Sequence, residues 1–476
     1  MVSKNGQPPN ALVAPPETFD LDEGAIHSAL AGAKEDPVRV REVLARAREL
    51  GGLAPGEVAV LAEVRDRTLL DELFATARSV KERIYGKRLV LFAPLYVSNL
   101  CSNECTYCAF RKRNRAINRR ALTMEEIARE VDVLLRQGHK RVLLVAGESY
   151  PKDGFGYVLK AVEAIYAVRT DRAYIRRVNV NVAPLTLDEF RELKESRIGT
   201  YQLFQETYHR PTYQSVHLSG VKRNYDWRAT ALHRAMAAGI SDVGIGVLFG
   251  LHDWRFEVLA LMQHIRSLES AFGVGPHTIS VPRIEPATGS DMASNPPCPV
   301  NDEDFRKIVA ILRLAVPYTG IIMSTRETAK IRRETFALGV SQISAGSRTQ
   351  PAGYAEGDAD ALSGQFSLGD HRSLDEVVRD VAVLGYLPSF CTACYRLGRT
   401  GKDFMDLAKP GEIRCHCDPN GITTFKEYLE DYASVATREV GERLIDETLC
   451  SIAPEIRSRT ARMLERVSAG QRDVLC

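Results

Sequence analysis

The amino-acid sequence predicts an α/β fold: a (β/α)8 barrel of the TIM type, with a helical extension before it and a mainly helical region after it. Three observations favour this class. Eight short apolar runs alternate with longer amphipathic stretches, as buried parallel strands alternate with helices. Glycine separates a helical stretch from the next run at Gly138 and Gly239. The 476-residue length suits one barrel of about 250 residues with additions. The expected strands span residues 88–98, 141–148, 177–184, 200–207, 243–250, 278–285, 320–327 and 341–347.

Start and stop signals support several helices. Residues 40–50 end at a glycine pair, and residues 68–86 repeat apolar positions at helical spacing before a final glycine. In residues 122–138, Thr123 and Glu126 form a capping box. A doubly wound open sheet is the alternative to the barrel, but no G-x-G-x-x-G follows the first strand to favour it.

We divide the chain into three predicted parts. Residues 1–87 form an N-terminal helical extension, residues 88–370 the barrel, and residues 371–476 a C-terminal region that carries a second group of cysteines. Residues 348–374 are rich in Gly, Ser and Asp, which indicates a linker or a lid loop.

The composition is that of an ordinary globular protein. A net charge of +2 gives no global attraction to nucleic acid or to a membrane. The N-terminal segment has no apolar core of a secretory signal, and the apolar run at 89–97 is shorter than the ~20 residues of a membrane span. We therefore expect a cytoplasmic protein without nucleic-acid or membrane partners. In that compartment, clustered cysteines among the ten present bind metal or do redox chemistry more often than they form disulfides.

Three cysteines follow the first expected strand. Cys101, Cys105 and Cys108 form the pattern C-x3-C-x2-C, at the barrel face where active sites are built. A structural zinc wants four protein ligands, whereas three thiolates on a 4Fe–4S cluster leave one iron open for a substrate or cofactor. A zinc site completed by a distant ligand and unrelated buried cysteines are the alternatives.

A second group of cysteines lies near the C-terminus. Cys391 and Cys394 form C-x2-C, and Cys415 and Cys417 follow in the same segment. The spacing is compatible with a zinc site and equally with a second iron–sulfur cluster. Composition does not decide between them.

The first cysteine motif, with aromatic Tyr107 before its last cysteine, resembles that of the radical S-adenosylmethionine (SAM) superfamily. The resemblance implies the same barrel and a 4Fe–4S cluster on the three cysteines. It also implies that the open iron chelates SAM and that Tyr107 lies near the adenine.

Two further strand ends resemble that superfamily. Gly147 and Glu148 end the second strand where the family has a glycine-rich motif that contacts the methionine amino group of SAM, with Ala146 in place of a first glycine. Glu206, at the end of the fourth strand, resembles the residue that holds the SAM ribose. A helix N-terminal acid and a solvated acid are the alternatives for the two glutamates.

The second cysteine group resembles that of the tyrosine-lyase maturases of iron-only hydrogenases. Cys391, Cys394 and Cys417 match C-x2-C-x22-C, and the resemblance extends over nearly the whole chain, with Cys415 outside the motif. It implies that a 5′-deoxyadenosyl radical from SAM takes a hydrogen from L-tyrosine, and that the Cα–Cβ bond breaks to give p-cresol and dehydroglycine. The fragment then becomes iron-bound CO and cyanide. These steps imply an auxiliary 4Fe–4S cluster with an additional labile iron.

Four more residues are site candidates. His277 precedes the sixth strand and so lies at the bottom rim of the barrel; the resemblance implies that it ligates the labile iron, and imidazole suits iron. Arg326 ends the seventh strand, where a guanidinium can hold the tyrosine carboxylate bidentately, as related lyases do. Tyr208 and His209, past the fourth strand, are candidates for the substrate pocket. A structural histidine and a helix-capping arginine are the alternatives.

The resemblance implies three partners: L-tyrosine, a one-electron reductant protein of the ferredoxin or flavodoxin type, and the other hydrogenase maturases. The basic loop 111–120 would favour an anionic reductant, and it also suggests a rival, an RNA-modifying enzyme. A second rival is the thiazole-pathway tyrosine lyase, a 2-iminoacetate synthase whose family lacks the C-terminal cysteines. A third is a non-catalytic iron–sulfur scaffold, which would need no such barrel.

Overall fold

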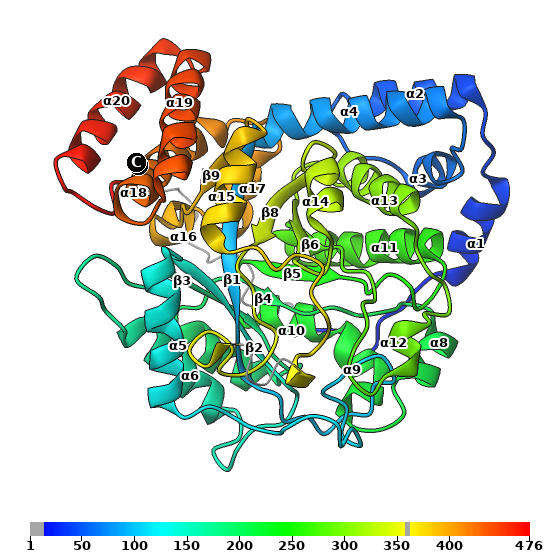
Figure 1. The fold of residues 1–476 in the computed structure, drawn as a ribbon. Helices are drawn as coiled ribbons and strands as arrows, with labels where there is room; N and C mark the ends of the chain where they lie inside the picture. Colours follow the sequence, from blue (N-terminus) through cyan, green and yellow to red (C-terminus); the bar gives the residue numbers. More distant parts are fainter. Residues whose placement is uncertain (1–13, 358–361) are drawn as a thin grey trace.

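Eight parallel strands close into a barrel at the centre of the computed structural model, which describes residues 14–357 and 362–476 (Figure 1). β1 pairs on one edge with β2 and on the other with β8, and this double pairing closes the ring. The strands are β1 (Arg88–Ser98), β2 (Arg141–Ala146), β3 (Arg177–Asn181), β4 (Tyr201–Gln202), β5 (Val243–Gly246), β6 (Thr278–Ser280), β7 (Gly320–Met323) and β8 (Val340–Ser344). The predicted barrel is confirmed, and the chain does not form the open doubly wound alternative.

Helices surround the barrel and connect its strands. The capping box predicted at Thr123 and Glu126 starts α5: Glu126 N donates to Thr123 Oγ1 (3.2 Å), and Thr123 N donates to Glu126 Oε2 (2.7 Å). Gly138 ends α5 with φ +103°, a conformation that favours glycine. These helices are α5 (Met124–Gln137), α6 (Gly156–Ala167), α7 (Leu187–Glu195), α8 (Arg210–Val216), the short 3-10 helix η1 (Val221–Arg223), α9 (Tyr225–Ala229), α10 (Ala231–Ala237), α11 (Trp254–Phe272), α12 (Asp291–Ser294), α13 (Asp302–Ala315) and α14 (Ala329–Phe336).

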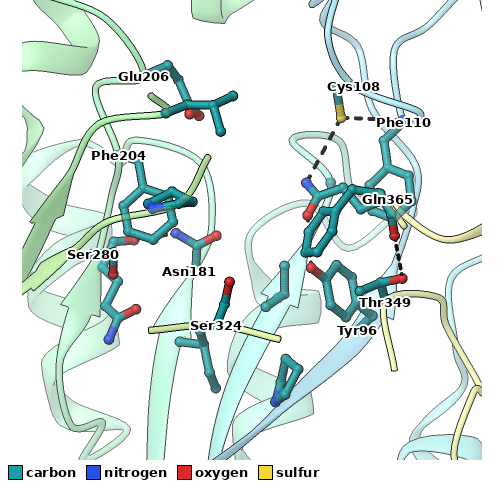
Figure 2. Close-up of a pocket in the computed structure, with 18 of the residues that line it drawn as sticks. Tyr96, Cys108, Phe110, Asn181, Phe204, Glu206, Ser280, Ser324, Thr349 and Gln365 are labelled. Carbon is teal, nitrogen blue, oxygen red and sulfur yellow. Dashed lines mark hydrogen bonds between the residues drawn. The ribbon is translucent and has the colours of Figure 1, made fainter. Parts of the chain in front are cut away.

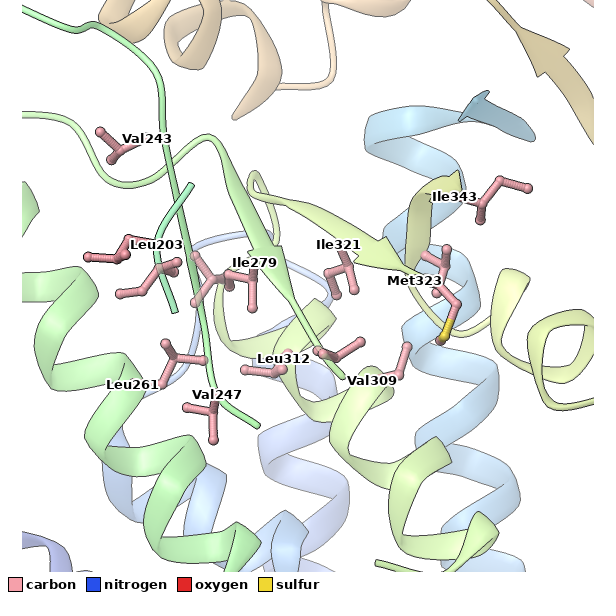
Figure 3. Packing of buried hydrophobic residues seen from close by; sticks show 14 of the residues in the cluster. Leu203, Val243, Val247, Leu261, Ile279, Val309, Leu312, Ile321, Met323 and Ile343 are labelled. Carbon is pink, nitrogen blue, oxygen red and sulfur yellow. The ribbon is translucent and has the colours of Figure 1, made fainter. Parts of the chain in front are cut away.

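The main hydrophobic core lies between the strands and the outer helices. Figure 3 shows Ile279 and Ile321 on neighbouring strands facing Leu261 of α11 and Leu312 of α13. All four side chains are fully or almost fully buried. Burial of each contributes roughly 1.5–3 kcal/mol to the hydrophobic free energy of folding, so this packing fixes where the strand ends lie.

The N-terminal extension is helical, as predicted, and packs on α11 and α13. Two hydrogen bonds join the two parts: Leu53 N donates to Ala315 O (3.3 Å), and the side-chain Nζ of Lys307 donates to Ala62 O (2.9 Å). Residues 1–13, which the prediction assigned to this extension, lie outside the described residues. Its helices are α1 (Glu23–Gly32), α2 (Pro37–Ala47), α3 (Pro55–Ala62) and α4 (Arg67–Tyr85).

The C-terminal region is mainly helical but adds one strand that the sequence did not predict. β9 (Leu387–Ser389) pairs in parallel with the start of β1 and so ties this region to the N-terminal end of the barrel. The domain boundary at residue 370 stays a prediction. Within the described ranges, no helix has both the length and the apolar character needed to span a lipid bilayer. The helices are α15 (Leu374–Val383), α16 (Ala393–Arg396), α17 (Gly401–Ala408), α18 (Arg414–Asp431), α19 (Val435–Ser451) and α20 (Pro454–Ser468).

Candidate active site

Two cavities lie at opposite ends of the barrel. The first, of about 180 Å³, is at the C-terminal ends of the strands, and the second, of about 50 Å³, is at their N-terminal ends. Each cavity is lined by one of the two cysteine groups found in the sequence. The structure therefore separates the two groups by the length of the barrel.

All three cysteines of the C-x3-C-x2-C motif line the first cavity. Figure 2 shows Cys108 Sγ beside the backbone N–H of Phe110 (3.4 Å) and the side-chain Nε2 of Gln365 (4.0 Å). Burial raises the pKa of Cys101 to about 11 and raises the pKa values of Cys105 and Cys108 as well. The thiols thus keep their protons until a metal replaces them.

The turn after β2 packs directly against the cysteine loop. Gly147 N donates to Ser98 O (2.9 Å), and a Cβ at position 147 would overlap the carbonyl oxygen of Leu100. Glycine is therefore required for this close approach. The next residue, Glu148, lines the cavity and accepts a hydrogen bond from Asn103 Nδ2 at Oε2 (2.7 Å).

Two carboxylates and two cations form a buried network on the cavity wall. Arg228 donates from Nη1 to Glu148 Oε1 (2.8 Å) and from Nη2 to Glu206 Oε1 (3.4 Å), and Lys222 Nζ lies 2.7 Å from the same Glu206 oxygen. Burial alone would raise the pKa of Glu148, but the positive charges of Arg228 and Lys222, together with the hydrogen bonds from Arg228 and Asn103, outweigh burial and hold that pKa below its usual value. Sequence reasoning found the two glutamates and missed Arg228 and Lys222, which come from α9 and η1 beyond the strand ends.

A third glutamate, Glu257, forms hydrogen bonds with the turn that carries Glu206. Glu206 has φ +72°, a left-handed conformation that is uncommon for residues other than glycine. The Glu257 carboxylate of α11 accepts hydrogen bonds from the Thr207 hydroxyl and from Tyr208 N (2.8 Å). Burial raises the pKa of Glu257 to about 7. No spacing in the sequence pointed to Glu257, because α11 and the end of β4 meet only in the fold.

Tyr208 and His209, which the sequence suggested for the substrate pocket, do not line the first cavity. Tyr208 is fully buried away from the cavity, and its hydroxyl is 2.8 Å from Nδ1 of His264. The His209 ring stacks on His252, with 3.9 Å between ring centroids. The chain turns outward after Glu206, so residues that follow it in sequence face α11 instead of the barrel interior.

Tyr107 lies in the first cavity, where the sequence placed it. Its hydroxyl is 2.8 Å from Nε2 of the buried His217. The Lys222 ammonium is 5.7 Å from the centre of the ring. The ring is therefore held from its hydroxyl end while the rest of it borders the cavity.

Arg326 also reaches the first cavity, at the end of β7. Its guanidinium stacks on Phe366 at 3.3 Å from the ring centre, and no described residue accepts a hydrogen bond from that guanidinium. The carboxyl of Glu285 lines the same cavity, and burial raises its pKa to about 7. This corner offers a cation with free donors and a carboxyl group, which suits the two charged groups of an amino acid.

The second cavity joins the C-terminal cysteines to the floor of the barrel. Cys391, Cys394 and Cys417 line it together with Arg88 and Arg141, which begin β1 and β2. Arg141 Nη2 donates to Cys391 O (2.7 Å). The Cys417 thiol donates to the Cys394 sulfur, which lowers the pKa of Cys394 to about 6 and raises that of Cys417. The half-buried Cys415 lies outside this lining set.

His277 lines the second cavity too, on the barrel side. Its Nδ1 is 3.6 Å from Asp242 Oδ1 and makes no hydrogen bond with a described residue. Its ring centre is 4.6 Å from that of Phe404. Burial lowers the pKa of His277, so the imidazole is neutral at pH 7 and free to bind a metal.

Both sites fit iron–sulfur clusters by the chemistry of their donors. Each brings three cysteine sulfurs to one cavity, and soft thiolates are the usual ligands of such clusters. In the part of the chain that the structure describes, no three His, Cys, Asp or Glu side chains are grouped to hold a single metal ion. The first cavity also extends past Glu148 and Glu206 to Arg326, which leaves charged groups beside the cysteines for a larger cofactor.

Comparisons with known proteins agree with this geometry. Residues 95–262 match the family model of the Radical SAM superfamily, and residues 280–387 match that of the Biotin and Thiamin Synthesis associated domain. The chain is 32% identical over 334 residues to the 2-iminoacetate synthase of Escherichia coli (strain K12). The aligned region covers 70% of this chain and 85% of that protein.

Two solved structures indicate which radical SAM family the chain is similar to. The crystal structure of HydG, a maturase of the [FeFe]-hydrogenase, is 48% identical with a TM-score of 0.92, and the match covers 96% of this chain and 99% of that chain. The X-ray structure of HydG from Carboxydothermus hydrogenoformans is 40% identical with a TM-score of 0.80. That match covers 93% of this chain and 97% of that chain. The barrel, the cysteine loop after β1 and the family match define a radical SAM enzyme. Within that class, the chain belongs to the HydG family of [FeFe]-hydrogenase maturases.

Proposed function

We propose that the protein is a radical SAM tyrosine lyase that converts the glycine-derived fragment of its substrate into iron-bound CO and cyanide for assembly of the hydrogenase H-cluster. The observation that carries this proposal is the pair of three-cysteine sites at opposite ends of one barrel. A lyase that stopped at dehydroglycine would have no use for the second site. The similarity to a 2-iminoacetate synthase and to HydG supports the first and second halves of the reaction respectively.

The first cavity supplies the groups that would hold SAM. When bound, a reduced 4Fe–4S cluster on the three cysteines and SAM together supply a 5′-deoxyadenosyl radical. The Glu148 carboxylate can accept hydrogen bonds from the SAM ammonium, and Glu206 from the ribose hydroxyls. Tyr107, which lines this cavity, would border the adenine. The buried walls keep water away from the reactive species.

Arg326 and Glu285 would orient L-tyrosine in the same cavity. The Arg326 guanidinium can bind the tyrosine carboxylate with two parallel hydrogen bonds. The Glu285 carboxylate can accept a hydrogen bond from the tyrosine ammonium. Loss of a hydrogen atom from tyrosine held in this way leads to cleavage of the Cα–Cβ bond. The ring portion would leave as a benzyl-type radical, which one electron from the reductant protein and one proton convert to p-cresol, and Arg326 would retain the carboxylate of dehydroglycine.

At the second cavity, we propose that Cys391, Cys394 and Cys417 hold the auxiliary 4Fe–4S cluster and that His277 ligates an additional labile iron. Arg88 and Arg141 offset the negative charge of the thiolates there. The proposal also includes a one-electron reductant protein for the first cluster and the other hydrogenase maturases as recipients of the product.

One assay tests the proposed function. The protein is reconstituted without oxygen with iron and sulfide, and SAM, dithionite and L-tyrosine are added. We expect p-cresol by chromatography and bands of iron-bound CO and cyanide by infrared spectroscopy. Absence of p-cresol would refute the lyase, and p-cresol without the infrared bands would favour the 2-iminoacetate synthase alternative.

A further inference from the structure

An exposed group of apolar and basic side chains covers the outer side of the cysteine loop. Leu218 and Val221 are 46% and 61% exposed, and Lys112, Arg113 and Arg223 are exposed as well. We call these five residues the cluster-loop patch. No carboxylate within residues 14–357 and 362–476 forms an ion pair with any of the three cations. The patch therefore combines positive charge with aliphatic surface.

Hydrogen bonds place the patch against the cysteine loop. Arg113 N donates to Glu104 Oε2 (2.8 Å), and Leu218 N donates to Glu104 O (2.9 Å). Arg223 Nη1 donates to Leu218 O (3.4 Å). Next to Glu104, Cys105 forms an antiparallel bridge with the residue that precedes Leu218. The basic segment and the apolar pair are thus joined through the backbone that carries the cysteines.

We propose that the cluster-loop patch is the docking surface for a small acidic one-electron carrier protein. The inference rests on the proposed function, because that function requires an electron at the first site. In the proposed function the cavity side of the loop would face SAM and tyrosine, and Cys105 is only 5% exposed, so the outer side remains for an electron donor. One electron leaves the donor's reduced cofactor and reduces the cluster by one, and no covalent bond forms or breaks.

The character of the patch fits such a donor. Three uncompensated cations would steer an acidic protein to this face. The two aliphatic side chains supply the small apolar contact that weak redox encounters use. Single-stranded RNA is a poorer fit, because its bases stack on aromatic side chains and the patch has none.

The test compares a protein donor with a small uncharged one. Reconstituted full-length enzyme receives SAM and L-tyrosine, and 5′-deoxyadenosine formation is measured with a reduced acidic flavodoxin or with photoreduced 5-deazariboflavin. The triple variant Lys112→Glu, Arg113→Glu, Arg223→Glu reverses the patch charge. A matched triple variant reverses exposed Lys330, Arg443 and Arg462, which lie elsewhere on the surface. A third variant, Leu218→Ser with Val221→Ser, removes the apolar pair.

We expect the patch charge reversal to lower the flavodoxin-driven rate about ten-fold or more at low ionic strength. The deazaflavin-driven rate and the matched variant should stay at the wild-type level. Added salt should slow the flavodoxin-driven reaction of the wild type and so reduce the difference in rate between the wild type and the charge-reversed variant. The serine variant should weaken flavodoxin binding without changing its salt dependence.

Other outcomes would overturn the docking proposal. The first is an unchanged flavodoxin-driven rate in the charge-reversed variant. The second is an equal loss of 5′-deoxyadenosine formation with flavodoxin and with deazaflavin. The third is binding of an RNA oligonucleotide to the patch while the flavodoxin-driven rate does not respond to the substitutions. If the wild type makes no 5′-deoxyadenosine with deazaflavin, the proposed function itself has failed. Flavodoxin binding by the wild type and the charge-reversed variant, measured without turnover, then still decides the docking proposal.

Discussion

The carboxylates of Glu148 and Glu206 are held by one guanidinium, that of Arg228. The two acids follow different strands, β2 and β4, and Arg228 lies 2.8 Å from the first and 3.4 Å from the second. Its Nε also donates to Phe204 O (2.7 Å), so the arginine is fixed to the backbone that leads to Glu206. The two glutamates that we propose to hold SAM are therefore both held by Arg228.

Replacing Arg228 should damage SAM binding and stability together. Arg228→Leu leaves two buried carboxylates with less compensation, which we expect to lower the free energy of unfolding by about 3–5 kcal/mol. The Kd for SAM, measured by equilibrium dialysis, should rise at least about ten-fold. Arg228→Lys keeps the positive charge but lacks the planar guanidinium that contacts both carboxylates. The Kd of this variant for SAM should therefore lie between those of the wild type and the leucine variant. A leucine variant with wild-type SAM affinity would show that the network does not support the cofactor.

Glu257 gives the protein a specific pH dependence of stability. Its folded-state pKa of about 7 lies above the ordinary value of 4.5, so its stabilising contribution is complete below pH 4.5 and is lost as the pH rises through 7. Glu257→Gln keeps an acceptor for Thr207 and does not ionise. Relative to this variant, the wild type should lose up to about 3 kcal/mol of stability between pH 5 and pH 8.

Denaturant unfolding of both proteins across that range measures the Glu257 effect. Glu285 also titrates near pH 7, but it is present in both proteins and cancels in the difference. Glu257→Ala removes the acceptor and should be destabilised at every pH. Parallel stability curves for the wild type and the glutamine variant would contradict the assignment.

Gln365 connects the proposed substrate cavity with a cysteine of the first site. Its Oε1 accepts from the Tyr96 hydroxyl (2.8 Å), and its Nε2 points to Cys108 Sγ (Figure 2). Because hydrogen bonds to sulfur raise cluster potentials, Gln365→Leu should make the potential of the reconstituted first cluster more negative. Tyr96→Phe, which keeps the contact to sulfur, should shift the potential less in a spectroelectrochemical titration. Equal shifts in both variants would argue against a direct effect on the sulfur.

Local patterns predicted most of the barrel and both cysteine groups. β1 begins and ends where its apolar run does, and α5 lies within its expected range, between a capping box and a glycine. His277 could be placed at the N-terminal end of the barrel because it precedes a strand, and the family resemblance linked it to the second cysteine group. The strand, helix and cysteine signals each lie within a few residues of the feature that they predict.

Features that depend on the fold could not be predicted in this way. Arg228 and Glu257 reach the site from helices, and their charges meet the strand ends only after folding. The position of Tyr208 outside the lining of the first cavity also depends on the fold, because the left-handed backbone at Glu206 turns the chain outward. β9 was missed because three residues with a central proline carry no strand pattern of their own, and its pairing with Arg88 depends on the finished barrel edge.

Substitution of Arg326 should weaken substrate binding selectively. Arg326→Lys keeps the positive charge but cannot form two parallel hydrogen bonds to a carboxylate. We expect the Kd for L-tyrosine, measured by calorimetry with SAM present, to rise about ten-fold or more, while SAM affinity stays within about two-fold of the wild type. Phe366→Leu, which removes the stacking partner, is the control. An unchanged tyrosine Kd in the lysine variant would assign the arginine a structural role.

His277 separates the two halves of the proposed reaction. It lies in the second cavity, at the opposite end of the barrel from the cysteine loop, so His277→Ala should leave p-cresol formation within about two-fold of the wild type. Loss of the imidazole should prevent retention of the labile iron, because neutral imidazole is a preferred iron ligand. Infrared bands of iron-bound CO and cyanide should therefore disappear.

Phe404→Leu is the matched control for His277, since Phe404 contacts the imidazole ring but offers no metal ligand. The leucine variant should keep both p-cresol and the infrared bands, and external imidazole should restore part of the bands in the alanine variant. Wild-type bands in His277→Ala would refute the ligand role. Loss of p-cresol in the same variant would instead show that the two cavities are not chemically separable.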